Sequence, residues 1–147
     1  MSASVEFASD EAIAHLAARV LDGTLPRAEW THAAHFAVAL WCVRHRADLA
    51  EVEGFREVIL RLNDAHGTVN SDSSGYHHTI TIASLAAARA VHDAQGEAAP
   101  LHAVLAGLLA GPFGRTDWIL AYWSRDRLFS VDARRGWIAP DLAPLPF

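Results

Sequence analysis

Residues 33–43 constrain the fold more than any other part of this sequence, because they are apolar on every face of a helix except at His35. A helix with this pattern is normally surrounded by other helices, so we expect it at the centre of the molecule. Trp30 and Thr31 precede it as a hydrophobic lead-in and an N-cap, and the helix should end near Arg46. The rest of the chain must pack around this segment.

Two histidines, His32 and His35, stand three residues apart at the start of this central helix. Imidazoles in an apolar environment are costly unless their nitrogens find partners. The best candidate for the partner segment is residues 75–81, where polar and aromatic side chains again crowd the start of an expected helix. We therefore expect the two segments to meet at one site.

The remaining periodicity predicts an all-α fold, a bundle of five or six helices with an extended Pro-rich C-terminal tail. At 147 residues, the chain is long enough for a single helical domain over residues 1–147. The expected helices cover residues 9–23, 31–46, 48–67, 76–94, 100–111 and 118–129, followed by a short helical turn over 130–135. Residues 140–147 contain too many prolines for a helix and should pack as a strap.

Charge and composition exclude several classes of function. The net charge is −5, and the 12 basic residues, all arginine, are scattered along the chain rather than gathered in a patch, which argues against nucleic-acid binding. The N-terminus has no basic and apolar leader, and no apolar run approaches ~18 residues, so we expect a cytoplasmic protein with no membrane partner. Cys42 lies within the apolar helix and should be a small core residue rather than a nucleophile.

The histidines suggest a metal site. Residues three apart on a helix point about 60° from each other, so His32 and His35 can present both imidazoles to one volume. His77 is the better third ligand, because Thr81 lies one turn below it, whereas His78 shares its face with an apolar residue. Such nitrogen ligands suit one divalent ion of zinc, iron, nickel or manganese.

Several polar residues near these histidines are candidates for orienting them or for supplying an oxygen ligand. They are Asn63, Asp64, His66, Asn70 and Tyr76. Burial near a helix N-terminus also lowers the pKa of an imidazole and keeps a neutral base available. The histidines are therefore candidates for general acid or base catalysis. No familiar catalytic motif is present, and no residue is assigned a catalytic role.

Four motifs occur together along the chain: W-T-H-x-x-H at 30–35, N-x-x-H-G-T-x-N at 63–70, G-Y-H-x-T-I-T at 75–81, and L-F-S-x-x-A-R-x-x-W followed by P-D-L-x-P-L-P within 128–146. In these motifs the sequence resembles a family of uncharacterised bacterial proteins, and the resemblance covers nearly the whole chain. It implies no activity. It implies a common pocket for Asn63, His66, Thr68 and Asn70, and it disfavours His78 as a ligand because that position is commonly acidic in the family.

Three functional hypotheses follow. The first is a His-lined polar pocket that binds a divalent metal through His32, His35 and His77 and acts on a small molecule. In this first hypothesis Tyr76, Asn63 and Asn70 orient the substrate or water. The second is a metal-free module that binds a small ligand in the same pocket. Under both hypotheses the further pocket residues are Asn63, His66, Thr68, Asn70, Tyr76 and Thr81. The third is an interaction protein in which Trp137 and the tail dock on a partner or on a second copy of the chain. In a further alternative, the histidines serve only the fold through their own hydrogen bonds.

Overall fold

The computed structural model describes residues 7–147, and this part of the chain is all-α, as the sequence predicts, with no strand. Residues 1–6, on which the expectation of no leader sequence rests, lie outside the described part. The elements are α2 (Asp10–Leu21), η1 (Arg27–Glu29), α3 (His32–His45), α4 (Ala47–Ala50), α5 (Val52–His66), α6 (His78–Gln95), α7 (Leu101–Ala110), η2 (Pro112–Gly114), η3 (Trp118–Ala121), α8 (Arg125–Leu128) and α9 (Val131–Arg135).

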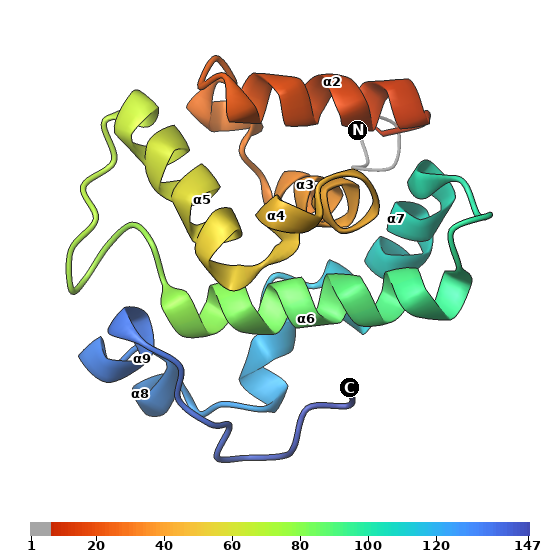
Figure 1. Cartoon of the computed structure of the whole chain (residues 1–147). Helices are drawn as coiled ribbons and strands as arrows, with labels where there is room; N and C mark the ends of the chain where they lie inside the picture. The colour runs from red at the N-terminus through yellow and green to blue at the C-terminus, as the bar shows by residue number, and fades with distance from the viewer. Residues whose placement is uncertain (1–6) are drawn as a thin grey trace.

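Helix α3 lies at the centre of the molecule, as its sequence predicts. Figure 1 shows it nearly end-on, framed by α2, α5, α6 and α7. Its side chains from Ala33 to Cys42 are almost all buried, including Phe36 and Leu40. The Thr31 hydroxyl accepts a hydrogen bond from the backbone N–H of Ala34 at 3.2 Å, which confirms the predicted N-cap.

One carboxylate connects the N-terminal ends of helices α2 and α7. Ser9 caps α2, and Asp10 in its first turn reaches across to the start of α7. Its two oxygens accept hydrogen bonds from the backbone N–H groups of Leu101 at 3.1 Å and His102 at 2.8 Å. A residue from one helix thus caps another that lies about ninety positions later in the sequence.

The predicted helix over residues 48–67 is divided into two helices. The backbone is extended at Glu51, with φ −77° and ψ 150°, so α4 ends there and α5 begins. Gly54 permits this turn, because a Cβ at that position would run into the backbone carbonyl oxygen of Asp48. Gly67 ends α5 in the left-handed region, with φ 70°, as its sequence predicts.

The predicted sixth helix over residues 118–129 was wrong. Instead, the chain forms η3, breaks, and begins α8 after Ser124. The break is held by contacts with the C-terminal segment: Asp141 accepts hydrogen bonds from the backbone N–H of Ser124 at 2.8 Å and from its hydroxyl at 2.7 Å. The indole of Trp123, fully buried, donates to the Ile138 carbonyl at 3.1 Å. Asp141 thus satisfies the Ser124 backbone N–H, which a continuous helix would have paired with a backbone carbonyl.

Residues 137–147 form no helix, and Figure 1 shows them running below α8 and the η3 segment. No helix within residues 7–147 is long and apolar enough to cross a bilayer.

Cys42 is a buried core residue, and burial raises the pKa of its thiol to about 12, so the thiolate is not available at neutral pH.

Candidate functional site

A cavity of about 340 Å³ lies between α3, α5 and α6, at the place where the sequence predicts a pocket. Three helices border it and no Asp, Glu, Lys or Arg lines it, so its walls carry no permanent charge. The lining residues are His32, His35, Phe36, Ala39, Phe55, Ile59, Asn63, Gly75, Tyr76, His77, Ile80, Thr81 and Ser84.

Helical periodicity explains how each helix contributes one face to the cavity. The contributing residues are spaced three or four apart, which places them on one side of a helix. On α3 they are residues 32, 35, 36 and 39; on α5 they are 55, 59 and 63; at the start of α6 they are 77, 80, 81 and 84.

The ring of His35 is held in one orientation and one tautomer. Its Nδ1–H donates to the Thr31 carbonyl at 2.7 Å, and the ring stacks on Trp30 with centroids 3.7 Å apart. Burial lowers the pKa of His35 from its ordinary 6.5 to about 4. The imidazole is therefore neutral at physiological pH, and its Nε2 is a hydrogen-bond acceptor.

His32 is held in the opposite tautomer. Its Nε2–H donates to the Phe113 carbonyl at 2.8 Å, which connects the start of α3 to η2. Its ring meets Phe36 edge-on with centroids 5.2 Å apart. The remaining nitrogen, Nδ1, has no hydrogen-bond partner in the described part of the chain.

His77 differs from the other two, because both of its nitrogens are engaged within the fold. Its Nε2–H donates to the Leu128 carbonyl at 2.7 Å, and its Nδ1 accepts the backbone N–H of Ile80 at 3.2 Å as the N-cap of α6. Burial lowers the pKa of His77, which keeps the ring neutral. The expected third metal ligand thus offers no free lone pair in this arrangement, and no group of three or more His, Cys, Asp or Glu side chains suited to a metal occurs within residues 7–147.

The polar residues from the α5–α6 connection form a small network beside the cavity. Asn63 lines the cavity and donates from Nδ2 to Asn70 Oδ1 at 2.9 Å, and the same oxygen accepts the backbone N–H of Tyr76, also at 2.9 Å. The Tyr76 hydroxyl hydrogen bonds with His78 Nδ1 at 2.7 Å. Asn70 therefore positions two cavity residues without lining the cavity itself.

The structure brings most of the predicted site residues to one cavity, but not Asp64, His66, Thr68 or Asn70. His66 donates from Nε2 to the Leu25 carbonyl at 2.7 Å and thereby fixes the end of α5. Thr68 contributes its backbone N–H to the Asn63 carbonyl at 2.9 Å, closing the C-terminal turn of that helix. These residues support the connection between α5 and α6 and lie outside the cavity wall.

The sequence interpretation missed the apolar wall and one hydroxyl. Phe55 and Ile59 precede Asn63 by eight and four residues on α5, and Ser84 follows Ile80 by four on α6. The helical spacing from the predicted residues was the signal that identifies these positions. The carbonyl partners of His32 and His77, from Phe113 and Leu128, carried no such signal because they come from distant segments.

Four side-chain polar atoms of the cavity residues make no hydrogen bond with any other group in the described part of the chain. They are His32 Nδ1, His35 Nε2, Asn63 Oδ1 and Ser84 Oγ. In residues 7–147 only Arg134 Nε is fully enclosed without a partner, so these four atoms remain accessible to an entering molecule. Asn63 contributes a carbonyl oxygen, which accepts only, and the neutral His35 ring offers Nε2 as an acceptor.

Fold and cavity together define a small helical protein with an uncharged, acceptor-rich cavity between three helices. Comparisons with family models, with curated proteins and with solved structures find no match for the chain. What the cavity accommodates is therefore argued from its own geometry.

Proposed function

We propose that this protein binds a small organic molecule whose uncharged part carries N–H or O–H donors, in the cavity between α3, α5 and α6. One observation carries the proposal. His32 and His35 each donate one ring N–H to a backbone carbonyl and keep the other nitrogen as an acceptor. Two acceptors in a largely apolar cavity favour a ligand that supplies the donors.

The size and rigidity of the site support binding. Its volume of about 340 Å³ falls within the range of about 300–1,000 Å³ typical of small-molecule pockets. Backbone carbonyls of Thr31 and Phe113 hold the two rings in place before any ligand arrives. Little side-chain entropy is then lost on binding, which improves the affinity for a given set of contacts.

A divalent metal is the second candidate, because the free nitrogens of His32 and His35 are also ligand atoms for zinc, iron, nickel or manganese. His77 would join them only by giving up its bond from Ile80 or by changing tautomer and losing its bond to Leu128. Water, or oxygen and nitrogen atoms of a bound molecule, would then complete the coordination of the metal. This candidate predicts zinc affinity that depends on both free histidines.

The test compares phenol with anisole, which are similar in shape although only phenol has a donor. Each compound is titrated into the full-length protein while ¹H–¹⁵N spectra follow the amides of Phe36, Ile59 and Ile80, which line the cavity. Phenol should shift these signals with about fivefold higher affinity than anisole, the equivalent of one net hydrogen bond of about 1 kcal/mol. Equal affinities, or shifts elsewhere only, would contradict the proposal.

Two variants on one helix separate the candidates. His35→Leu removes one acceptor from the cavity and should reduce the preference for phenol over anisole, whereas His45→Leu, exposed at the end of α3 and outside the cavity, should leave it unchanged. Zinc chloride titrated into EDTA-treated protein provides the second arm. Tight zinc binding that is lost in His35→Leu and retained in His45→Leu would favour the metal candidate instead.

A further inference from the structure

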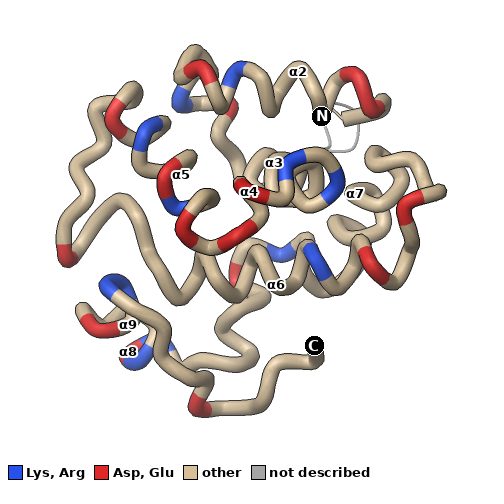
Figure 2. Tube along the Cα trace, in the orientation of Figure 1, with Lys and Arg blue, Asp and Glu red and all other residues tan. Residues whose placement is uncertain are grey.

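A second cavity, of about 240 Å³, lies beside the histidine-lined cavity and shares Tyr76 with it. It is formed where α5, the α5–α6 connection and α9 meet, and Figure 2 shows basic residues of α5 and α9 close to that connection. Its lining residues are Arg56, Leu60, Asn70, Ser71, Asp72, Tyr76, Arg134 and Arg135. We call it the arginine cavity.

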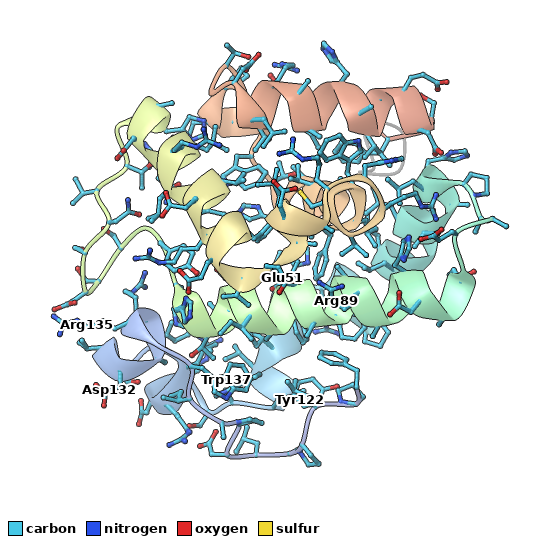
Figure 3. All side chains as sticks on the ribbon, viewed as in Figure 1. Glu51, Arg89, Tyr122, Asp132, Arg135 and Trp137 are labelled. Atoms are coloured by element: carbon cyan, nitrogen blue, oxygen red, sulfur yellow. The ribbon has the colours of Figure 1, made fainter. Side chains whose placement is uncertain are left out.

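Three guanidinium groups and one carboxylate line the arginine cavity, which leaves an excess of positive charge. Arg135 is paired: it donates to both oxygens of Asp72, at 2.8 and 2.7 Å. Figure 3 shows Arg135 beside the tip of the α5–α6 connection, while Asp132 lies on the other side of α9. The Arg135–Asp72 pair explains how α9 is attached to the connection, but it neutralises only one of the three arginines.

Arg134 has no carboxylate partner within residues 7–147. One terminal nitrogen donates to the carbonyls of Gly75 and Tyr76, at 3.1 and 3.3 Å, so the guanidinium is held in place by neutral groups. Its Nε is enclosed without any hydrogen-bond partner. A cation fixed by carbonyls keeps its charge available to an anion in the cavity.

Arg56 comes to the same cavity from α5. Its guanidinium lies over the ring of Tyr76, with its central carbon 5.5 Å from the ring centroid. The nearest carboxylate, Glu57, is 3.9 Å away and mostly exposed, so that pair is a weak surface contact. Unlike Arg134 and Arg135, Arg56 makes no hydrogen bond to the connection or to α9 in the described part of the chain, so its guanidinium N–H groups are available to an anion.

We propose that the arginine cavity binds the carboxylate or phosphate of an organic acid whose uncharged part occupies the histidine-lined cavity. The inference rests on the proposed function, because it adds a charged group to the small organic molecule proposed there. Guanidinium groups recognise planar and tetrahedral oxyanions through paired N–H donors. The two cavities are neighbours, since Tyr76 lines both of them.

The experiment titrates 4-hydroxyphenyl phosphate, 4-hydroxybenzoate, phenol and inorganic phosphate into the full-length protein at constant ionic strength, followed by ¹H–¹⁵N spectra. Both organic anions keep the phenol hydroxyl that the proposed function requires. 4-Hydroxyphenyl phosphate or 4-hydroxybenzoate should bind at least tenfold more tightly than phenol and should shift amides of both cavities. Inorganic phosphate should shift only residues around Asn70 and Tyr76. Whichever of the two organic anions binds more tightly identifies the acid group of the ligand.

Arg56→Met keeps the aliphatic stem and removes the charge, and Arg61→Met, exposed on the same helix and lining neither cavity, is the matched control. Arg56→Met should reduce the affinity for the better anion about tenfold and leave phenol binding unchanged, and Arg61→Met should change neither. A second variant, Asn70→Asp, retains the Oδ1 acceptor for Asn63 and Tyr76 but adds a negative charge, so it should also reduce anion affinity while preserving the fold.

The outcomes separate this inference from the proposed function. Equal binding of phenol and 4-hydroxyphenyl phosphate, insensitive to Arg56→Met and Asn70→Asp, would overturn the arginine cavity as an anion site and leave the proposed function standing. Phosphate binding that depends on Arg56, without phenol binding, would contradict the proposed function and the joined ligand but support the anion site. Binding of neither kind would overturn both.

Discussion

His77 joins the start of α6 to the end of α8, because its Nε2–H donates to the carbonyl of Leu128, 51 residues further along the chain, at 2.7 Å. Its other ring nitrogen accepts the backbone N–H of Ile80 at 3.2 Å. One imidazole therefore begins a helix and also attaches the C-terminal segment to it. This double use explains why a histidine stands at the N-cap, where an asparagine or serine would serve the cap alone.

The two roles of His77 are separable by substitution. His77→Asn retains an N-cap acceptor but loses the bond to Leu128, and we expect the free energy of unfolding to fall by about 1–2 kcal/mol. His77→Ala loses both bonds and should cost about 2–3 kcal/mol. Urea unfolding measures both values, with His45→Asn, exposed on α3, as the control. Equal losses for Asn and Ala would show that the cap contributes nothing.

The pKa of His35 predicts a pH dependence of stability. Burial lowers the folded-state pKa to about 4, below the ordinary value of 6.5, so the unfolded chain binds more protons between these two values. Stability should therefore decrease as the pH falls from 6.5 to 4, by about 1–2 kcal/mol for this partly exposed ring. Unfolding curves of wild type and His35→Gln across this range measure the effect. The variant should lose less stability on acidification; parallel curves would contradict the assignment.

Gly54 and Gly107 both lie inside helices, yet opposite effects are expected on substitution by alanine. A Cβ at Gly54 would collide with the Asp48 backbone carbonyl, whereas a Cβ at Gly107 would meet no atom within 4 Å. Gly54→Ala should destabilise by about 1–3 kcal/mol through overpacking, and Gly107→Ala should stabilise by about 0.5–1 kcal/mol through helix propensity. Thermal unfolding distinguishes the two, and a stabilised Gly54→Ala would contradict the observed turn between α4 and α5.

Asp10 should stabilise α7 more than its own helix. Asp10→Ala removes the acceptors for Leu101 and His102 and should cost about 1 kcal/mol, while Glu11→Ala, its neighbour on α2, serves as the control for charge at that helix start. Burial raises the pKa of Asp10, but the hydrogen bonds from His102 and Leu101 outweigh it, and the net pKa lies below 3.8. The loss in free energy of unfolding caused by Asp10→Ala should be present above pH 3.8. It should shrink as the pH falls through the folded-state pKa of Asp10.

The sequence alone determined the features that depend on near neighbours in the chain. Helical spacing placed the apolar faces, and the capping residue Thr31 marked the start of α3. The all-round apolar pattern of residues 33–43 also indicated a central position, since no other arrangement buries every face of that helix. The same spacing placed His32 and His35 on one face of that helix, and both line one cavity in the structure.

Tertiary structure decided what those residues are able to do. The breaks at Glu51 and after Trp123 depend on Gly54 meeting Asp48 and on Asp141 meeting Ser124, which are contacts that local propensity does not encode. Carbonyls from distant segments, those of Phe113 and Leu128, decide which ring nitrogens of His32 and His77 remain free. A tautomer is set by the partner across the fold, and the sequence records that partner only as an ordinary backbone group.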